Sequence, residues 1–391
     1  MVPEGWEEGR VGDLLEKLES GVSVNGEDRP LQPGEFGVLR VSSVTYGTFK
    51  PSAAKAIVPK DISRAKCHPR AGQIIISRSN TDELVGASAF VEKDYPNLYL
   101  SDKLWQTVPK PHANMKWLSY VLASKHTRYL LSNLATGTSG SMKNITKDEL
   151  LTLKASIPPV QEQKKIAQIL STWDQAITAT ERLLENSRQR KKGLMQQLLT
   201  GKKRLPGFEG EWESSILTEH CSVTTGNKDL QNKVENGEYP FFVRSSNIER
   251  IDSYSFDGEA ILIPGDGRVG EIFHYIDGKF DFHQRVYKLS DFEGALGLFI
   301  YYYLKRFFKA EVIKHSVKAT VDSLRMPVFT GMRIKLPSLE EQRQIVNVLS
   351  CSDKEIQAIT QRLYLLKQEK KALMQQLLTG KRRVQVDTEA A

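Results

Sequence analysis

Two stretches of the chain carry residues, most of them apolar, at alternating steps of four and three. The first set is Ile166, Leu170, Trp173, Ile177, Thr180, Leu184, Ser187, Lys191, Leu194 and Leu198. The second set is Ile345, Leu349, Ser352, Ile356, Ile359, Leu363, Leu366, Lys370, Leu373 and Leu377. This spacing is a heptad seam, and it predicts two long helices that need a packing partner to be stable.

The two stretches are copies of one another. Residues 158–202 and 337–381 align without a gap at a constant offset of 179, and both end in Leu-Met-Gln-Gln-Leu-Leu-Thr-Gly-Lys. Prolines precede both stretches, and Gly201 and Gly380 stand where a left-handed C-terminal cap is expected. Each helix should therefore cover about 40 residues, or roughly 60 Å at 1.5 Å per residue.

A narrow apolar stripe favours pairing of the two helices with each other. Because the first helix leads into the second globule and the second helix leaves it, such a pair is antiparallel. The alternative is that each helix packs on its own globule. In the antiparallel register two polar seam residues lie level with carboxylates, so we predict salt bridges Lys191–Asp353 and Lys370–Asp174. Alternatively, the lysine stems lie along the seam and their ammonium groups reach water.

The segments outside the helices alternate like short strands at 36–44, 73–77, 87–91, 239–244, 260–264 and 271–276, with helical patterns at 115–134 and 294–314. A weaker repeat pairs Gly5-Trp6 with Glu211-Trp212, Ser20-Gly21 with Thr225-Gly226, and Leu84-Val85-Gly86 with Arg268-Val269-Gly270. The predicted fold is α+β. It has two globules with mainly antiparallel sheets, at opposite ends of two long antiparallel helices with pseudo-two-fold symmetry. The predicted boundaries are 1–156, 157–205, 206–335 and 336–384.

Composition narrows the class of protein. The chain has 391 residues, a formal net charge of +8 and a pI of about 9.1. This charge favours an acidic partner such as nucleic acid, although a basic surface also serves solubility. The three cysteines are scattered without a CxxC pair, which favours a reducing compartment over a disulfide framework or a zinc cage. The sequence has no apolar run of membrane length and no signal-peptide pattern, so we expect a cytoplasmic protein.

Motifs for catalysis are missing or only apparent. Residues 265–270 spell GxGxxG, but the residues that follow alternate like a strand, whereas a dinucleotide site needs a helix there. Glu162-Gln163-Lys164 resembles a nuclease fragment but opens a helix, where a carboxylate favours the dipole. The sequence contains no P-loop, no methyltransferase motif of the Asn-Pro-Pro-Tyr type and no metal-binding histidine spacing. We therefore predict no catalytic residue, no metal and no cofactor.

Several loops combine the residue types that hydrogen-bond base edges and phosphates. In the first globule the candidate DNA contacts are Arg40, Ser42, Ser43, Thr45, Tyr46, Arg78, Ser79, Asn80, Thr81, Lys103, Thr138, Ser139 and Lys143. In the second globule they are Arg244, Ser245, Ser246, Asn247, Asp266, Arg268, His283, Gln284, Arg285, Lys318, Thr320 and Arg325. The loops diverge while the helices stay alike, as expected if the globules read different sequences from one frame.

Two other classes of function stay open on this reasoning. The chain could be a free-standing nuclease or methyltransferase, against which the missing motifs argue. It could also be a coiled-coil scaffold that joins proteins without reading DNA.

Over its full length the sequence resembles the DNA-specificity subunits of type I restriction–modification systems. The resemblance rests on the helix starts Pro-Pro-Val-Gln-Glu-Gln and Pro-Ser-Leu-Glu-Glu-Gln, the paired helix ends, the Gly-Trp-Glu and Glu-Trp-Glu starts, and Ser-Arg-Ser-Asn-Thr-Asp-Glu-Leu-Val-Gly at 77–86. The second globule departs from that last pattern at 264–268.

The resemblance implies two target recognition domains, each reading half of a bipartite double-stranded DNA site, and a coiled-coil spacer that fixes the gap. It also implies partners: two methyltransferase subunits that hold S-adenosylmethionine, and an ATP-dependent restriction and translocation subunit. The chain itself would be a non-catalytic reader.

Overall fold

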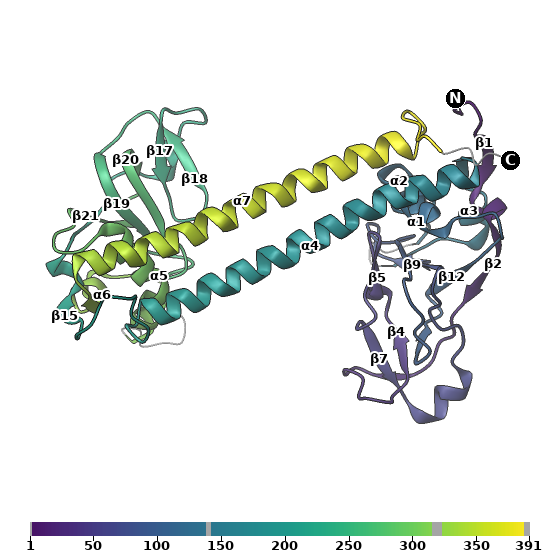
Figure 1. The fold of residues 1–391 in the computed structure, drawn as a ribbon, viewed down its shortest axis with the longest axis horizontal. Coiled ribbons are helices and arrows are strands. Elements are labelled where there is room, and N and C mark those ends of the chain that lie inside the picture. The colour runs from purple at the N-terminus through teal and green to yellow at the C-terminus, as the bar shows by residue number, and fades with distance from the viewer. Residues whose placement is uncertain (1, 138–141, 315–322, 387–391) are drawn as a thin grey trace. The chain divides into compact units, whose positions relative to one another are not determined.

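The computed structural model describes residues 2–137, 142–314 and 323–386, which form two compact units (Figure 1). Unit 1 consists of Met1–Ala179 and Leu363–Ala391, and unit 2 of Thr180–Arg362. The boundary between the units falls within both long helices, α4 (Val160–Leu198) and α7 (Leu339–Leu377). Unit 1 therefore contains the start of α4 and the end of α7, and unit 2 contains the end of α4 and the start of α7.

The two long helices agree with the seam prediction. Each has 39 residues, and their bounds differ by the offset of the sequence repeat. Every predicted seam position is buried or half-buried. Gly201 and Gly380 adopt φ values of +68° and +67°, and they close the helices with N–H bonds to Leu198 O and Leu377 O. The predicted left-handed caps are confirmed.

The helix segments run antiparallel within each unit. In unit 1, Lys370 Nζ lies 2.5 Å from Asp174 Oδ1. In unit 2, Lys191 Nζ pairs with Asp353 Oδ1. Both predicted salt bridges are confirmed, and the alternative of lysines that extend only into water is wrong.

Buried carboxylates at the helix starts fix this register. In unit 1, the Glu162 side chain is 2% exposed and accepts hydrogen bonds from Trp6 Nε1 at 2.9 Å and from Arg383 Nε and Nη2 at 2.8 Å. In unit 2, Glu341 is 1% exposed and accepts from Arg204 Nε at 2.7 Å and Nη2 at 2.6 Å. The start of each helix is thus joined to the residues just after the end of the other. The helix dipole is a minor reason for Glu162 to stand at this position, because its carboxylate belongs to a buried ion pair.

The residue after each buried carboxylate is a glutamine, and it joins the long helix to its globule. Gln163 Nε2 donates to Pro158 O at 2.9 Å, and its Oε1 accepts the N–H of Asn114 at 3.0 Å. Gln342 makes the matching bonds, to Pro337 O at 3.0 Å and from Leu296 N–H at 2.9 Å. Asn114 and Leu296 immediately precede two globule helices, α1 (Met115–Ala123) and α5 (Gly297–Lys314) respectively.

The globule of unit 1 contains two four-stranded sheets. The first is antiparallel and has the order β10-β8-β12-β2: Ser88–Phe90, Ile74–Ser77, Leu104–Pro109 and Leu15–Ser20. The second has the order β11-β4-β7-β3: Leu98–Leu100, Gly37–Leu39, Ala54–Ile57 and Gly26–Glu27, with β11 parallel to β4. The helices α1, α2 (Lys125–Leu134) and α3 (Lys147–Leu151) complete the globule.

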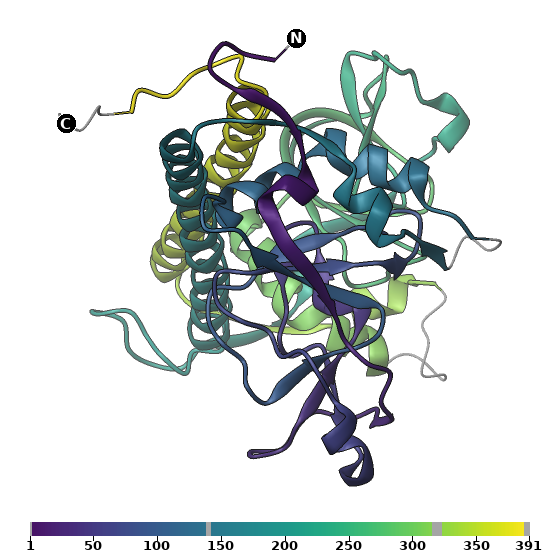
Figure 2. The same cartoon turned by 90° about the vertical axis from the view of Figure 1, so that its right-hand side faces the viewer.

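Three short strand pairs complete unit 1. β1 (Glu7–Arg10) pairs with β14 (Lys154–Ile157), β5 (Val44–Thr45) with β6 (Thr48–Phe49), and β9 (Ser79–Asn80) with β13 (Lys143–Asn144). Figure 2 shows the N-terminal segment, in purple, running beside the end of α7, in yellow. A Cβ on Gly380 would lie 2.3 Å from Pro3 Cγ, so this approach requires glycine.

The globule of unit 2 has one six-stranded sheet of order β16-β21-β19-β20-β17-β18. Its strands are Ser222–Thr225, Val286–Ser290, Phe256–Pro264, His274–Phe282, Tyr239–Phe242 and Ile248–Ile251. Only β17 and β20 pair in parallel among the strands described there. β15 (Glu213–Ile216) pairs with β22 (Arg333–Leu336), as β1 does with β14, and α6 (Met326–Thr330) precedes β22. The predicted fold class is confirmed.

Three elements differ from the sequence prediction. The predicted strand 36–44 ends at Leu39 and continues as a 3-10 turn over Val41–Ser43, with Ser43 N–H bonded to Arg40 O. The predicted helix 115–134 is broken at Ser124, which is extended and accepts the N–H of Thr127 on its Oγ. Residues 271–273 precede the strand, which begins at His274; Glu271 lies in a turn and binds Arg268 and Lys309.

No helix among the described residues is both long and apolar enough to cross a membrane.

The first prediction concerns the ion pair of Glu162. Replacing Arg383 with Ala removes the cation from a buried carboxylate that keeps only neutral partners, Trp6 and the backbone of Val384, among the described residues. We therefore expect a loss of roughly 2 kcal/mol in the free energy of unfolding. This lies below the 3–5 kcal/mol typical of a fully buried pair because Arg383 is 43% exposed. The matched control is the exposed neighbour Arg382→Ala, which should change stability by less than about 0.5 kcal/mol. Denaturant unfolding measures both.

The same variant has a pH signature. Burial alone raises the pKa of the Glu162 carboxyl, but hydrogen bonds from Arg383 and Trp6 outweigh it and hold the pKa below the usual 4.5. Stabilisation by the ionised carboxylate is therefore present above pH 4.5 and is lost as pH falls through the lowered pKa. The stability difference between wild type and Arg383→Ala should narrow on acidification. A difference that is constant with pH would contradict the ion-pair account.

Candidate nucleic-acid interface

In each globule, candidate loops come together where one strand of its main sheet ends. The main sheet is the antiparallel four-stranded sheet with β8 in unit 1 and the six-stranded sheet with β19 in unit 2. In unit 1, Arg78 donates its N–H to Lys103 O at 3.0 Å and accepts the N–H of Ile145 at 2.9 Å. In unit 2, Gly265 donates to Arg285 O at 2.7 Å and accepts from Leu324 at 2.6 Å. Arg78 and Gly265 are therefore equivalent, and so are Lys103 and Arg285. Each globule has a basic residue at the second of these positions.

Two glycine pairs allow the close backbone approaches and left-handed turns beside these loops. A Cβ on Gly21 would lie 2.1 Å from Leu100 O, and one on Gly226 would lie 2.0 Å from Phe282 O. Gly86 and Gly270 have φ values of +70° and +72°, and a Cβ on Gly86 would lie 2.9 Å from the Leu131 side chain. These two glycine pairs of the weak sequence repeat thus mark positions where the fold leaves no room for an ordinary side chain.

An arginine that the sequence reasoning missed anchors the loop of unit 1. Arg128, on α2, is 8% exposed, and its Nη1 and Nη2 donate to the backbone oxygens of Val85 and Glu83. Its guanidinium lies 6.0 Å from the centre of the Tyr46 ring, which is 61% exposed. Arg128 therefore joins two of the predicted contact loops. The only signal in the sequence is a cation on the buried side of an amphipathic helix.

Within unit 1, β9 carries Ser79 and Asn80 and pairs with β13, which carries Lys143. Asn80 Nδ2 donates to Ser77 Oγ at 3.2 Å, while Lys143 Nζ lies 3.7 Å from Asp82. Lys103 Nζ lies 3.7 Å from Met142 Sδ. The side chains of Arg78, Asn80, Lys103 and Lys143 are half-buried at this strand end.

In unit 2 a carboxylate holds two arginines. Asp266 Oδ2 lies 3.2 Å from Arg244 Nη1 and 3.5 Å from Arg285 Nη1. The Asp266 side chain is 17% exposed, whereas the two arginines are 46% and 63% exposed. The strand ends of β17, β19 and β20 thus bring three residues together that lie far apart in the sequence. Because a carboxylate repels phosphate, the role that suits Asp266 is indirect: it orients the guanidinium groups of the two arginines.

His283 is buried rather than exposed. It is 2% exposed, its Nδ1 accepts the N–H of Arg285 at 2.9 Å, and its Nε2 lies 3.7 Å from Asp229 Oδ2. Burial, and then the charge of Arg244, lower the pKa of this imidazole. His283 therefore stays neutral near pH 7 and shapes the turn that presents Arg285. The neighbouring Gln284 donates from Nε2 to Asp229 Oδ2 at 2.9 Å.

The predicted contact residues differ in exposure. The exposed ones are Ser42, Tyr46, Thr81, Arg244, Ser246, Asn247, Arg268, Gln284, Arg285 and Arg325. The half-buried ones are Arg40, Thr45, Arg78, Asn80, Lys103, Lys143, Ser245 and Asp266. The buried ones are Ser43, Ser79 and His283. Thr138, Ser139, Lys318 and Thr320 lie outside the described residues.

Two exposed or half-buried arginines are engaged elsewhere. Arg40 pairs with Asp28 beside the second sheet, and the interactions of its guanidinium do not join it to the Arg78 loop. Arg268 Nε lies 2.9 Å from Glu271, which also binds Lys309 at 2.6 Å.

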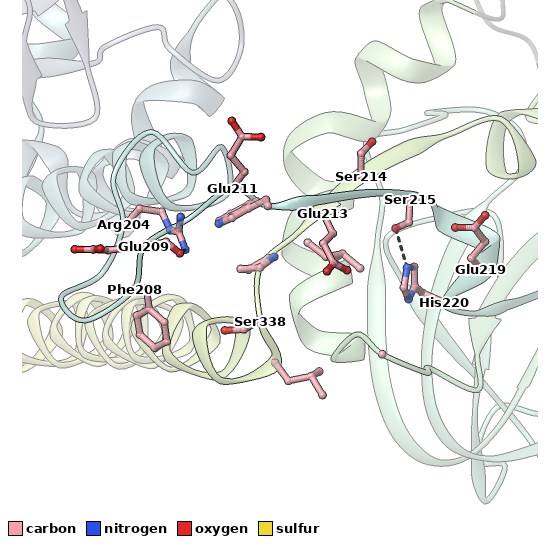
Figure 3. A pocket seen from close by; sticks show the side chains of 15 residues that line it. Arg204, Phe208, Glu209, Glu211, Glu213, Ser214, Ser215, Glu219, His220 and Ser338 are labelled. Atoms are coloured by element: carbon pink, nitrogen blue, oxygen red, sulfur yellow. Dashed lines mark hydrogen bonds between the residues drawn. The ribbon is translucent and has the colours of Figure 1, made fainter.

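A cavity of about 540 Å³ lies elsewhere in unit 2 and contains a serine–histidine pair (Figure 3). Ser215 Oγ lies 2.7 Å from His220 Nε2, and His220 Nδ1 lies 2.9 Å from Glu293 O. If Nδ1 donates to that carbonyl, Nε2 accepts from the serine, and the imidazole joins β15 to the Glu293 loop. The cavity also adjoins the Arg204–Glu341 ion pair, so its wall is part of the helix-start junction. Among the described residues no cluster of metal-ligating side chains occurs.

Comparisons with known proteins point to one family. The sequence matches the family described as type I restriction modification DNA specificity domain over residues 3–186 and 209–368. A putative type I restriction enzyme MjaX specificity subunit of Methanocaldococcus jannaschii is 25% identical over 422 residues, which cover 98% of this chain and 95% of the relative. The MjaVIII specificity subunit of the same organism is 25% identical over 423 residues, covering 98% and 94%.

Solved structures share the fold. The S subunit of a type I restriction–modification system from M. genitalium has a TM-score of 0.66 at 15% identity, with 96% of each chain covered. A chain from a study of complex assembly and conformational transition of the type I R-M system has a TM-score of 0.58 at 20% identity, covering 98% of this chain and 100% of that one.

The second prediction concerns Asp266. In Asp266→Ala the two arginines lose their common carboxylate, so we expect discrimination between target and competitor DNA to fall by about 1–3 kcal/mol, the range for a bidentate base contact. Overall affinity for competitor DNA should stay the same or rise, because a negative charge is removed. Asp257→Ala, an exposed carboxylate on the same strand, is the control. Equal discrimination in both variants would show that Asp266 does not orient a base contact.

Proposed function

Because the chain belongs to the family of type I restriction–modification DNA specificity subunits, we propose that each of its two globules reads one half of a bipartite double-stranded DNA site. The globules are residues 1–156 and 206–335. The chain is a non-catalytic specificity subunit, so its own chemistry is hydrogen bonding to bases and contact with phosphates. Adenine methylation and DNA cleavage belong to other chains of the complex.

One observation supports two separate readers above all others. In each globule the candidate loops come together where one strand of the main sheet ends, on the same backbone hydrogen bonds, yet the side chains on those bonds differ. Arg78 occupies one position in unit 1 where Gly265 stands in unit 2, and Lys103 corresponds to Arg285. A common frame with different side chains is what two readers of different sequences need.

We propose that the helix segments 157–205 and 336–384 serve as the spacer between the half-sites. A helix of 39 residues is about 60 Å long at 1.5 Å per residue. At 3.4 Å for each base pair that length corresponds to roughly 17 base pairs. We expect this number to be an upper bound on the gap, because each reader would itself cover part of that length of DNA.

The partners we propose are two modification subunits, which hold S-adenosylmethionine, and restriction and translocase subunits that use ATP. The support is the family membership and the similarity to a chain studied in the assembly of a type I system. Helix faces outside the seam are available for these partners, and Tyr364 on α7 is 58% exposed. We expect the complex to act in the cytoplasm, where it meets DNA.

The third prediction tests the spacer. One heptad is inserted within residues 178–189 and a second within the repeat-equivalent residues 357–368, so the seam stays continuous on both helices. We expect the gap of the recognised site to lengthen while both half-sites keep their sequences. The measurement is a map of methylated adenines on DNA exposed to the full methyltransferase complex. The matched control inserts a heptad in one helix only, which should disturb the pairing and abolish activity.

A changed half-site with an unchanged gap would contradict the spacer proposal. If the complex methylates no two-part site at all, the wider proposal of two readers fails instead.

The fourth prediction concerns the first reader. Arg78 and Asn80 lie where β8 ends and the candidate loops of unit 1 come together, which we call its reading edge. These residue types bind guanine and adenine bidentately. Arg78→Ala should lower discrimination at the first half-site by about 1–3 kcal/mol and leave the second half-site unchanged. Binding to duplexes mutated in one half-site at a time gives the result. A uniform loss on all sequences would make Arg78 a phosphate contact, and no loss would make it structural.

A further inference from the structure

A tyrosine from each globule joins the salt bridge that the seam lysine makes. In unit 1, Tyr120 Oη donates to Asp174 Oδ2 at 2.7 Å, and Asp174 Oδ1 binds Lys370. In unit 2, Tyr302 Oη donates to Asp353 Oδ2 at 2.7 Å, and Asp353 Oδ1 binds Lys191. Each carboxylate thus uses one oxygen for the other long helix and one for the globule.

The lysine also contacts the tyrosine directly. Lys370 Nζ lies 5.3 Å from the centre of the Tyr120 ring, and Lys191 Nζ lies 5.1 Å from that of Tyr302. These distances are within the range of cation–π attraction. The two tyrosines are 6% and 2% exposed, and the lysine side chains are 20% and 11% exposed. All three groups of each triad are therefore connected pairwise at a partly buried junction.

Each triad connects three elements of one unit. Tyr120 lies on α1 and Tyr302 on α5, the helices that contribute Trp117 and Phe299 to the globule cores. The aspartate lies on one long helix and the lysine on the other. The hydrogen bonds are directional, so the triad restrains both sliding and rotation of the globule on its stretch of the helix pair.

Stability alone is a poor reason for this arrangement. A lysine in a heptad seam costs stability, and replacing a buried ion pair with apolar residues is often neutral or stabilising. Yet both copies of the repeat keep the lysine and the aspartate, and both globules supply a tyrosine at the matching point. A positional role explains why a costly arrangement occurs twice.

We propose that the Lys370–Asp174–Tyr120 and Lys191–Asp353–Tyr302 triads are positioning residues that make the protein selective for the one gap length that its helices set. The inference rests on the proposed function of the globules as half-site readers. Adding one base pair to the gap moves a half-site by 3.4 Å along the DNA and turns it by about a tenth of a helical turn. A globule held firmly on the helices rejects such a site, whereas a globule that rocks accepts it.

The experiment uses the chain assembled with its modification subunits. Its natural site is first mapped by methylation, and duplexes are then made with the gap one base pair shorter, natural and one base pair longer. The variants are Tyr120→Phe, Tyr302→Phe and the double variant, which remove only the two hydroxyl groups. Tyr129→Phe is the matched control, because Tyr129 also lies on a helix of unit 1 but is 65% exposed.

We expect each single variant to reduce the preference for the natural gap by roughly threefold or more, because hydrogen bonds to a charged carboxylate are among the stronger ones. The double variant should lose more, and Tyr129→Phe should behave as wild type. Discrimination of bases within each half-site should stay unchanged in all of them. That readout separates positioning from general loosening of the reading edge.

Unchanged gap preference in the folded double variant would overturn the proposal, as would an equal loss of base discrimination. Asp174→Asn and Asp353→Asn provide a second test if a tyrosine variant does not fold, since each keeps the side-chain volume and removes the charge that the lysine and tyrosine share. Gap preference that is retained in both Asn variants would also reject the triads. If the wild-type complex shows no gap preference, the proposed function itself fails rather than this inference.

Discussion

The antiparallel register of α4 and α7 is the constraint on which the rest of the structure depends. Two buried carboxylates, Glu162 and Glu341, fix it by binding arginines that follow the end of the other helix. A buried charge without its partner costs several kcal/mol, so the pairing has few alternatives. A slip by one helical turn would separate each carboxylate from its arginine and would also break the two lysine–aspartate pairs of the seam.

This register also determines how each globule is held. The glutamines beside the two carboxylates bind the backbone just before α1 and α5, and the aspartates of the seam bind Tyr120 and Tyr302 on the same two helices. Each globule is thus attached to its helix segments at two points. These attachment points recur in both copies, whereas the candidate loops of the two globules differ in sequence.

The sequence predicted the paired long helices well, because this common frame of the two globules is repetitive. A heptad seam, a capping glycine and a lysine level with an aspartate all follow from helix geometry. The repeat also continues to Arg204 and Arg383, which are 179 residues apart. The sequence therefore marks both arginines as repeat mates, but helix periodicity alone does not show that they bind the carboxylates. The break at Ser124 was missed because a serine is tolerated inside a helix until its side chain caps the next one.

The reading edge was harder to predict. Residue types located the loops, but burial of Ser43, Ser79 and His283 depends on the strands that pack around them. The role of Asp266 depends on Arg244 and Arg285, which only the six-stranded sheet brings together. Arg128, Tyr120 and Tyr302 lie on amphipathic helices, and nothing local distinguishes such residues from ordinary core or surface positions.

The central claim is that one frame holds two independent readers. Its most direct test replaces residues 206–335 with the corresponding globule of a relative that recognises a different sequence, and then maps the methylated sites of the assembled complex. The account predicts a new second half-site beside an unchanged first half-site and an unchanged gap. A change in the first half-site or in the gap would contradict it.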